Sequence, residues 1–238
     1  MAGLYVHIPF CRQACRYCDF YFTVSLKYRD DLVKALVREI ELRSDEFRNL
    51  RFETLYFGGG TPSVLTADEL ATITDAVFRN YQFGEQPEFT LEANPDDLKP
   101  DYLKNIRNLG INRLSMGVQS FHDRDLELMR RSHTAKQAEK AIKLAQDTGF
   151  ENMSVDLIYG IPGTTTIDFE ENLIKVFEFN IPHISAYHLT FEPGTVFDHW
   201  LKKGRLAPVD EDESFHQFSL LKKLTAEQDF LHYEISNF

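Results

Sequence analysis

The chain has 238 residues, 43% of them hydrophobic, and a formal net charge of −11, which suits one large α/β domain or two small ones. This acidity argues against a broad nucleic-acid surface, because such surfaces are built from clustered Lys and Arg. We find neither a signal peptide nor a run of about 18 apolar residues, so we expect a cytoplasmic protein without a membrane span.

Short β-rich runs alternate with longer helical runs along most of the chain. Strands are expected at 4–8, 54–57, 88–93, 113–118, 154–158 and 183–189. Helices are expected at 28–49, from the capping box at 66–69 onward, and at 100–109, 123–129, 134–148 and 166–179. About six successive βα units predict a parallel sheet, and because a closed barrel has eight, we expect an open, partial TIM-like barrel.

Residues 191–238 do not continue this alternation. A turn at 193–194 precedes helices at 196–203 and 214–228 and a final strand at 231–235. We therefore divide the chain into a partial-barrel core at 1–190 and the beginning of a C-terminal region at 191–238. A terminal strand without a closing element indicates a shortened chain or a missing domain.

All three cysteines, Cys11, Cys15 and Cys18, lie in the segment CRQACRYCDF after the first strand. Thiolates gathered this closely are typical of a metal site and make a poor disulfide framework. Structural zinc is usually held by four ligands, and only His7 lies nearby. Three thiolates leave one iron of a [4Fe–4S] cluster open to a substrate, so the motif favours a cluster, with zinc as the alternative.

Polar or glycine-rich positions also follow the other strands. Because ligands of parallel α/β folds bind at the carboxyl ends of the strands, these positions should meet at one rim. They are 58–61, Glu92, Asn94, Gln119, Ser120, Asp156, Tyr187 and His188. The sequence therefore predicts one shared site that includes the cysteine loop.

Glu92 and Asp156 are the most informative of these residues. A carboxylate inside an apolar parallel strand is costly unless it is paired or faces a ligand, so we interpret both as ligand contacts, with a structural ion pair as the alternative. Arg131 follows Arg130, so its position alone favours a solvated side chain, with a ligand contact as the alternative. We interpret His133 and His188 as structural histidines with satisfied hydrogen bonds.

Together these motifs resemble the radical S-adenosylmethionine (SAM) superfamily, whose cluster loop has the same CxxxCxxC spacing. The segments YVHIPFC, FGGGTPS, LEANP, SMGVQSF and DLIYGIPG resemble one branch, the oxygen-independent coproporphyrinogen III oxidase-like proteins. The resemblance extends from Tyr5 to about Phe238. It implies that Cys11, Cys15 and Cys18 ligate three irons of a [4Fe–4S] cluster and that SAM chelates the fourth.

The resemblance also implies a set of SAM contacts. These are Tyr17 near the adenine, Gly59, Gly60 and Thr61 along the methionine part, Gln119 and Asp156 at the ribose hydroxyls, and Arg131 at the carboxylate. Glu92 and Tyr5 are matched as SAM contacts without a stated group. No catalytic residue is implied beyond the cluster and the SAM site.

Two features of the sequence depart from the pattern of the oxidases. The oxidases carry a fourth cysteine where this chain has Phe20, and they carry an N-terminal extension before the position of Tyr5. Both features resemble instead the haem chaperone subgroup, which binds SAM and a cluster and transfers haem. The resemblance thus implies haem or porphyrin as a ligand of the full-length protein. It also implies an electron donor and a haem-acceptor protein as partners.

Three other functions remain open. The main alternative is an oxygen-independent coproporphyrinogen III oxidase, which performs oxidative decarboxylation in porphyrin biosynthesis, and Phe20 argues against it. A radical SAM enzyme acting on tRNA is disfavoured by the acidic charge, and a zinc-binding module without catalysis is the third. The family continues into a C-terminal domain with haem-associated residues, which we expect this chain to lack.

Overall fold

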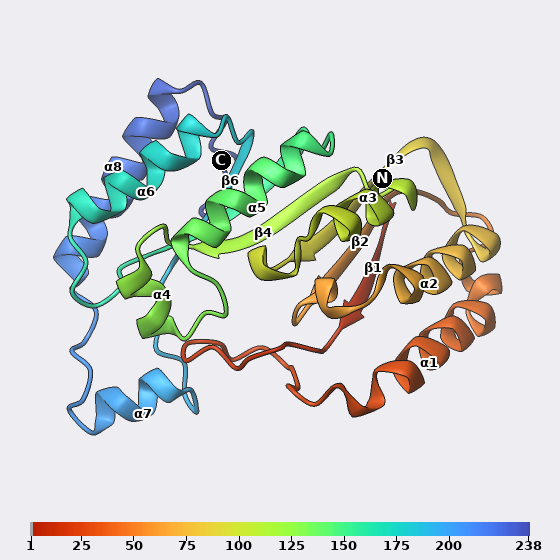
Figure 1. Ribbon diagram of the computed structural model, residues 1–238, viewed down its shortest axis with the longest axis horizontal. Coiled ribbons are helices and arrows are strands. Elements are labelled where there is room, and N and C mark those ends of the chain that lie inside the picture. Colours follow the sequence, from red (N-terminus) through yellow and green to blue (C-terminus); the bar gives the residue numbers. More distant parts are fainter. Residues whose placement is uncertain (1) are drawn as a thin grey trace.

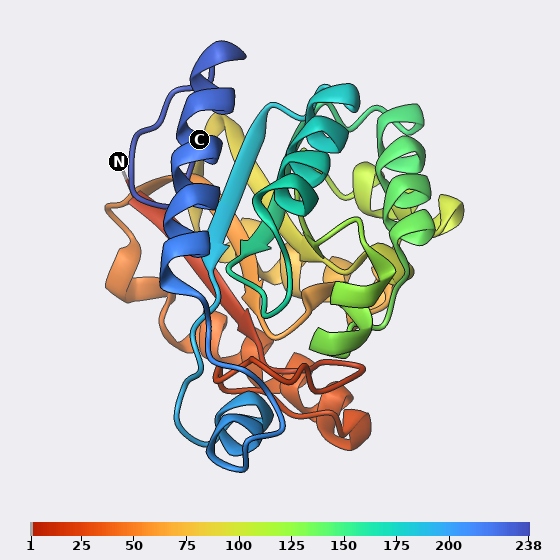
Figure 2. The ribbon, with the colours of Figure 1, turned by 90° about the vertical axis from the view of Figure 1, so that its left-hand side faces the viewer.

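Residues 2–238 of the computed structural model form an α/β fold built on one six-stranded parallel sheet (Figure 1). Strands that follow one another in the chain are neighbours in the sheet, in the order β1 to β6. The strands are β1 Ala2–Ile8, β2 Arg51–Gly59, β3 Gln82–Ala93, β4 Arg113–Gln119, β5 Asn152–Tyr159 and β6 His183–His188. The sheet curves without closing, which confirms the predicted partial barrel (Figure 2).

Helices follow most of the strands and cover the convex side of the sheet (Figure 2). They are α1 Arg29–Leu42, α2 Ala67–Asn80, α3 Pro100–Asn108, α4 Asp123–Met129, α5 Ala135–Asp147, α6 Thr166–Glu178, α7 Val196–Lys202 and α8 Glu211–Glu227. Capping boxes begin α2, α5 and α6, at Thr66, Thr134 and Thr165. Within residues 2–238, none of the helices is both long and apolar enough to cross a membrane.

The first predicted helix, 28–49, is too long by about two turns. The structure ends α1 at Leu42 and adds a separate 3₁₀ turn at Ser44–Phe47. The Ser44 hydroxyl donates a hydrogen bond to the Glu41 carbonyl at 2.9 Å, which is the local side-chain competition that ends helices at serine. The apolar spacing continued past this point, so periodicity alone missed the break.

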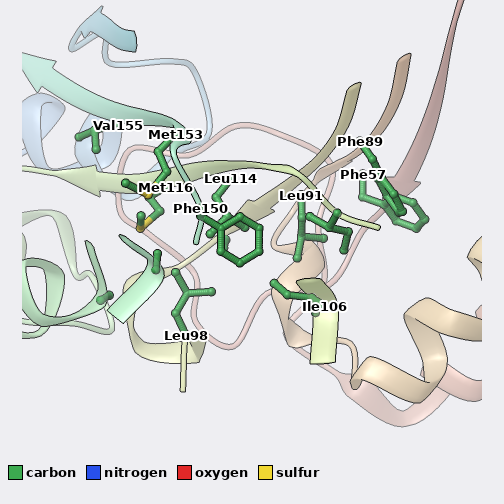
Figure 3. Packing of buried hydrophobic residues seen from close by; sticks show 14 of the residues in the cluster. Phe57, Phe89, Leu91, Leu98, Ile106, Leu114, Met116, Phe150, Met153 and Val155 are labelled. Atoms are coloured by element: carbon green, nitrogen blue, oxygen red, sulfur yellow. The ribbon is translucent and has the colours of Figure 1, made fainter. Parts of the chain in front are cut away.

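The apolar core lies between the sheet and the helices (Figure 3). Side chains alternate along each strand, so one face of β2 to β5 carries fully buried residues such as Phe57, Leu91, Leu114 and Val155. The opposite, concave face carries polar and charged groups, among them Glu92, Ser115, Asp156 and Ser185. A closed barrel fills its interior with branched apolar residues, whereas this open barrel keeps a polar interior.

The predicted final strand at 231–235 is wrong, because no strand forms there in the described chain. The chain meets the free edge of β6 only at its last residues, where Ser185 and Asn237 form an isolated antiparallel bridge. The side chains of Leu231, Tyr233 and Ile235 alternate as in a strand but remain exposed. Because Asn237 lies opposite Ser185 in an antiparallel register, residues 231–233 would lie beyond the end of β6 at His188 and have no strand to pair with.

Candidate functional site

The carboxyl ends of the strands open onto one cavity of about 510 Å³. The predicted site residues that line it are Cys11, Cys15, Tyr17, Cys18, Gly59, Gly60, Thr61, Glu92, Gln119, Arg131 and Asp156. Tyr5 lies outside this cavity: the residue is 55% exposed, and its ring stacks on Tyr56 with ring centres 6.0 Å apart. The expectation that polar residues at the carboxyl ends of the strands meet at one rim is therefore confirmed for all of the predicted cluster and SAM contacts except Tyr5.

The cysteine loop leaves β1 and returns to it. The Cys11 N–H donates to the Thr23 carbonyl at 3.0 Å, and the Thr23 N–H donates to the Pro9 carbonyl at 2.7 Å. These two bonds tie the ends of the loop together, so the cysteines project from a closed turn of chain. All three are free thiols and partly buried in the described structure.

Burial governs the ionisation of the Cys11 and Cys18 thiols. It raises the pKa of Cys11 above its ordinary value and raises that of Cys18 to about 11. Without a bound cation these side chains are therefore neutral at physiological pH, and a metal would favour their thiolates. Among residues 2–238, no group of three His, Cys, Asp or Glu side chains is arranged to hold a single metal ion. A [4Fe–4S] cluster holds each thiolate on a different iron, so it does not require that arrangement.

The glycine run brings the end of β2 against the cysteine loop. A Cβ at Gly60 would lie 2.7 Å from the Phe10 carbonyl oxygen and 3.0 Å from the Cys11 sulfur, so only glycine fits without a shift. The neighbouring Thr61 hydroxyl lies 3.4 Å from the same sulfur, and the Thr61 N–H donates to the Phe10 carbonyl at 2.7 Å. The two motifs are thus two walls of one site.

Arg131 is partly buried and lines the cavity, so it is not the solvated residue that position alone favoured. Its Nη2 donates to Asn94 Oδ1 at 2.6 Å and to the Gly117 carbonyl at 2.7 Å. Its Nη1 lies 3.4 Å from the Cys15 sulfur and 3.3 Å from the Tyr17 hydroxyl. Its Nε is buried and has no hydrogen-bond partner among residues 2–238. The guanidinium therefore places a positive charge beside a cysteine and retains one unused donor.

Two carboxylates form the floor of the cavity. Glu92 accepts hydrogen bonds from the Tyr56 hydroxyl at 2.7 Å and from the Gly59 N–H at 3.0 Å, while burial raises its pKa. Burial also raises the pKa of Asp156 to about 7, and repulsion from Glu92 adds to the shift. At neutral pH, Asp156 is therefore both a donor and an acceptor of hydrogen bonds.

Gln119 holds an unusual backbone conformation at the end of β4. Its φ is 71°, in the left-handed region that residues other than glycine rarely adopt, and the pairing with β5 shifts register between Gly117 and Gln119. Its Oε1 is buried and accepts no hydrogen bond from the described part of the chain. Strain and an unsatisfied acceptor occur together at ligand sites, and this oxygen suits a hydroxyl donor.

A buried polar network supports the segment after Gln119. The Ser120 hydroxyl donates to the Asp125 carboxylate at 2.8 Å, and Asn172 Oδ1 accepts from the Phe121 N–H at 2.5 Å. Asp125 and Asn172 are each at most 3% exposed. The network joins α4 and α6 to the turn that follows Gln119. It therefore stabilises the strained backbone of Gln119.

The two histidines differ from each other. His133 is buried, with its Nε2 3.1 Å from the Val118 carbonyl and a pKa that burial lowers to about 4, but its buried Nδ1 has no partner within residues 2–238, so its hydrogen bonds are only partly satisfied. His188, predicted to be satisfied, lines the cavity, and its buried Nε2 finds no partner within the described chain. Sequence reasoning also missed Thr190 and Glu192, which line the cavity just after β6. Extending the search for strand-end residues four positions past His188 would have found both.

Comparison with known proteins agrees with this geometry. The family model of the radical SAM superfamily matches residues 5–175. The chain is 36% identical over 235 residues to the heme chaperone HemW of Lactococcus lactis, covering 98% of this chain and 61% of that protein. It is 34% identical over 239 residues to HemW of Escherichia coli, with coverage of 98% and 61%. The chain thus spans about three fifths of these relatives.

Among solved structures, the chain is similar to the coproporphyrinogen III oxidase HemN from Escherichia coli, described as a radical SAM enzyme. The two superpose with a TM-score of 0.89 at 28% identity, over 99% of this chain and 55% of the other. An archaeal Elp3 is similar in fold, with a TM-score of 0.65 at 19% identity. The partial-barrel fold is therefore shared with these structures.

Proposed function

The chain belongs to the radical SAM superfamily, and on that premise we propose that it is the cluster- and SAM-binding part of a haem chaperone. The observation that carries the proposal is the convergence of three free thiols and the matched SAM contacts on one cavity. The names of the two HemW relatives support delivery of haem to acceptor proteins as the activity of the whole protein. Phe20, at the position of the oxidases' fourth cysteine, supports the same branch.

The residues around the cavity fit both a [4Fe–4S] cluster and SAM. Thiolates are the ligands that iron–sulfur clusters take, and three of them border the cavity. The buried Nε of Arg131 is a donor without a partner in residues 2–238, and it suits the carboxylate of SAM. Gln119 Oε1, likewise unmatched in the described chain, and Asp156 suit the ribose hydroxyls. The absence of a Cβ at Gly60 lets the backbone of the glycine run approach Cys11 closely.

When bound, the cluster supplies one electron to the sulfonium of SAM. The residues of the chain orient and enclose the two groups. Arg131 holds the Cys15 side of the cysteine loop against the cavity, with its Nη1 3.4 Å from the Cys15 sulfur. Glu92 holds the Gly59 amide in place, so that the glycine run keeps its backbone turned toward the cavity. Around pH 7, Asp156 accepts a hydrogen bond when ionised and donates one when protonated.

The test is anaerobic reconstitution of the protein with iron and sulfide, followed by titration with SAM and then with haem. We expect one oxygen-sensitive cluster per chain, lost in Cys15→Ala, and SAM binding that depends on the cluster. Zinc without iron after reconstitution would contradict the proposal. Haem titration and transfer to apo-haemoproteins use the full-length protein, because this chain spans about three fifths of its relatives.

The similarity to HemN makes coproporphyrinogen III oxidation the second candidate function. The same reconstituted protein is incubated anaerobically with coproporphyrinogen III, SAM and a low-potential electron donor. We expect no protoporphyrinogen, because Phe20 stands where the oxidases carry a cysteine. Formation of protoporphyrinogen at a catalytic rate would replace the chaperone assignment. The proposed setting is the cytoplasm, where thiols stay reduced.

A further inference from the structure

An arginine follows each of the first two cysteines in CRQACRYC, as Arg12 and Arg16. A charged side chain after a cysteine in a surface loop is ordinarily solvated. In this structure both guanidinium groups instead contact groups outside the loop, and they do so on different elements of the fold. The cysteine loop, residues 9–23, is therefore anchored at two points beyond its own ends.

Arg12 anchors the loop to the turns that follow β2 and β3. Its Nε donates to Asp97 Oδ1 at 2.5 Å. The Asp97 side chain is only 2% exposed, and its other oxygen accepts from the Ser63 hydroxyl at 2.7 Å. Ser63 in turn accepts from the Asn94 N–H at 3.1 Å, which continues the chain of bonds to the end of β3. A charge-assisted bond to a buried carboxylate resists solvent competition better than an exposed pair does.

Arg16 anchors the loop to α4 and α7. Its Nη1 donates to the carbonyls of Glu127 at 3.2 Å and Leu128 at 3.0 Å, in the last turn of α4, where a cation also opposes the negative end of the helix dipole. Its guanidinium lies over the Trp200 ring, 4.5 Å from the ring centre. The side chain thus joins two helices that are about 70 residues apart in sequence.

The backbone of Arg16 makes the same two connections. Its N–H donates to the Met129 carbonyl at 3.0 Å, and its carbonyl accepts from the Phe197 N–H at 3.0 Å. Figures 1 and 2 both show the loop lying between α4 and α7. Phe197 and Trp200 pack in one apolar cluster with Tyr17, the residue between Arg16 and Cys18. Helix α7 therefore contributes to the wall that carries Cys15 and Cys18.

We infer that Arg12 and Arg16 are positioning residues, which hold the cysteine loop in its ligand-binding shape before a cluster is bound. The inference rests on the proposed cluster function of the three cysteines. Arginine suits both positions because its planar fork donates to several acceptors at once and stacks on an aromatic face. A loop ordered in advance loses less conformational entropy when the cluster binds, so it binds the cluster more tightly.

The first test uses the protein without a cluster and measures backbone hydrogen exchange. In Arg16→Ala, we expect exchange to rise about tenfold in peptides covering 11–23 and 196–202, because both helix contacts weaken. In Arg12→Ala the increase should be confined to the loop. Arg38→Ala is the matched control, since Arg38 pairs with Glu41 on the exposed face of α1. Exchange equal to wild type in both loop variants would overturn the inference.

The second test measures iron content and the electron paramagnetic resonance spectrum after anaerobic reconstitution. We expect the double variant Arg12→Ala/Arg16→Ala to bind less iron than the wild type and to give an altered spectrum. The iron content of Arg16→Lys should lie between those of the double variant and the wild type. Leu221→Ala controls for general destabilisation, because Leu221 is fully buried on α8, and it should lower the melting temperature while keeping the wild-type spectrum. A wild-type spectrum in the double variant would refute the inference, whereas failure of the wild type to form a cluster would refute the proposed function.

Discussion

Replacement of Gly60 by alanine tests whether the glycine run and the cysteine loop form one site. The new Cβ would lie 2.7 Å from the Phe10 carbonyl oxygen and 3.0 Å from the Cys11 sulfur. The nearest atom belongs to the backbone, which cannot rotate away as a side chain does. Relief of the clash therefore requires the loop to move away from β2, together with the Cys11 thiol.

The magnitude follows from two opposing effects. Overpacking in a close-packed site destabilises a protein by about 1–3 kcal/mol. Replacing glycine by alanine also restricts the unfolded chain, which stabilises by about 0.4–1 kcal/mol. We therefore expect Gly60→Ala to lower the free energy of unfolding by about 1–2 kcal/mol, and the melting temperature by about 2–8 °C for a chain of this size.

Gly84→Ala is the matched control. A Cβ there would meet the carboxylate of Glu53, the far end of a flexible and partly exposed side chain that moves at little cost. We expect this variant to be neutral or slightly stabilised, so the two substitutions should differ in sign. Urea unfolding of both, followed by iron content after reconstitution, checks the reasoning. Wild-type stability and wild-type iron content in Gly60→Ala would refute it.

Three further predictions concern the floor and supports of the cavity. Because the pKa of Asp156 is raised to about 7, the folded state binds the extra proton between about pH 4 and pH 7, so this group's contribution to stability declines as the pH rises through that window. As the pH rises from 5 to 8, the free energy of unfolding of Asp156→Asn, measured with urea, should therefore increase relative to that of the wild type. A difference between the two proteins that does not change with pH would contradict the raised pKa. Asn172→Ala leaves the Phe121 N–H without its acceptor and should cost about 1–3 kcal/mol in the same assay, and it should weaken SAM binding through Gln119. Arg131→Lys keeps the charge but loses the planar fork, so SAM affinity measured by calorimetry should fall about tenfold or more; equal affinity would exclude Arg131 from the carboxylate site.

The sequence alone determined the fold class and the location of the site. Alternating and 3.6-residue patterns are local signals, and the capping box at Thr66 marked the start of α2 within one residue. Because ligands of parallel sheets bind at the carboxyl ends of the strands, the sequence predicted that Cys11, Glu92 and Asp156 lie at one site, and all three line the cavity. These inferences succeeded because each depends on residues a few positions apart or on a property common to parallel sheets.

Only the tertiary structure decided how the site is held. The bond between Arg131 and Cys15 joins residues 116 positions apart, and position in the sequence alone made Arg131 a surface residue. The positive φ of Gln119 depends on a register shift against β5, which no local pattern encodes. The contacts of Arg16 with α4 and α7 likewise depend on where three separate segments pack. Short-range patterns specify elements, whereas the environment of a side chain is set by long-range packing that the local sequence does not record.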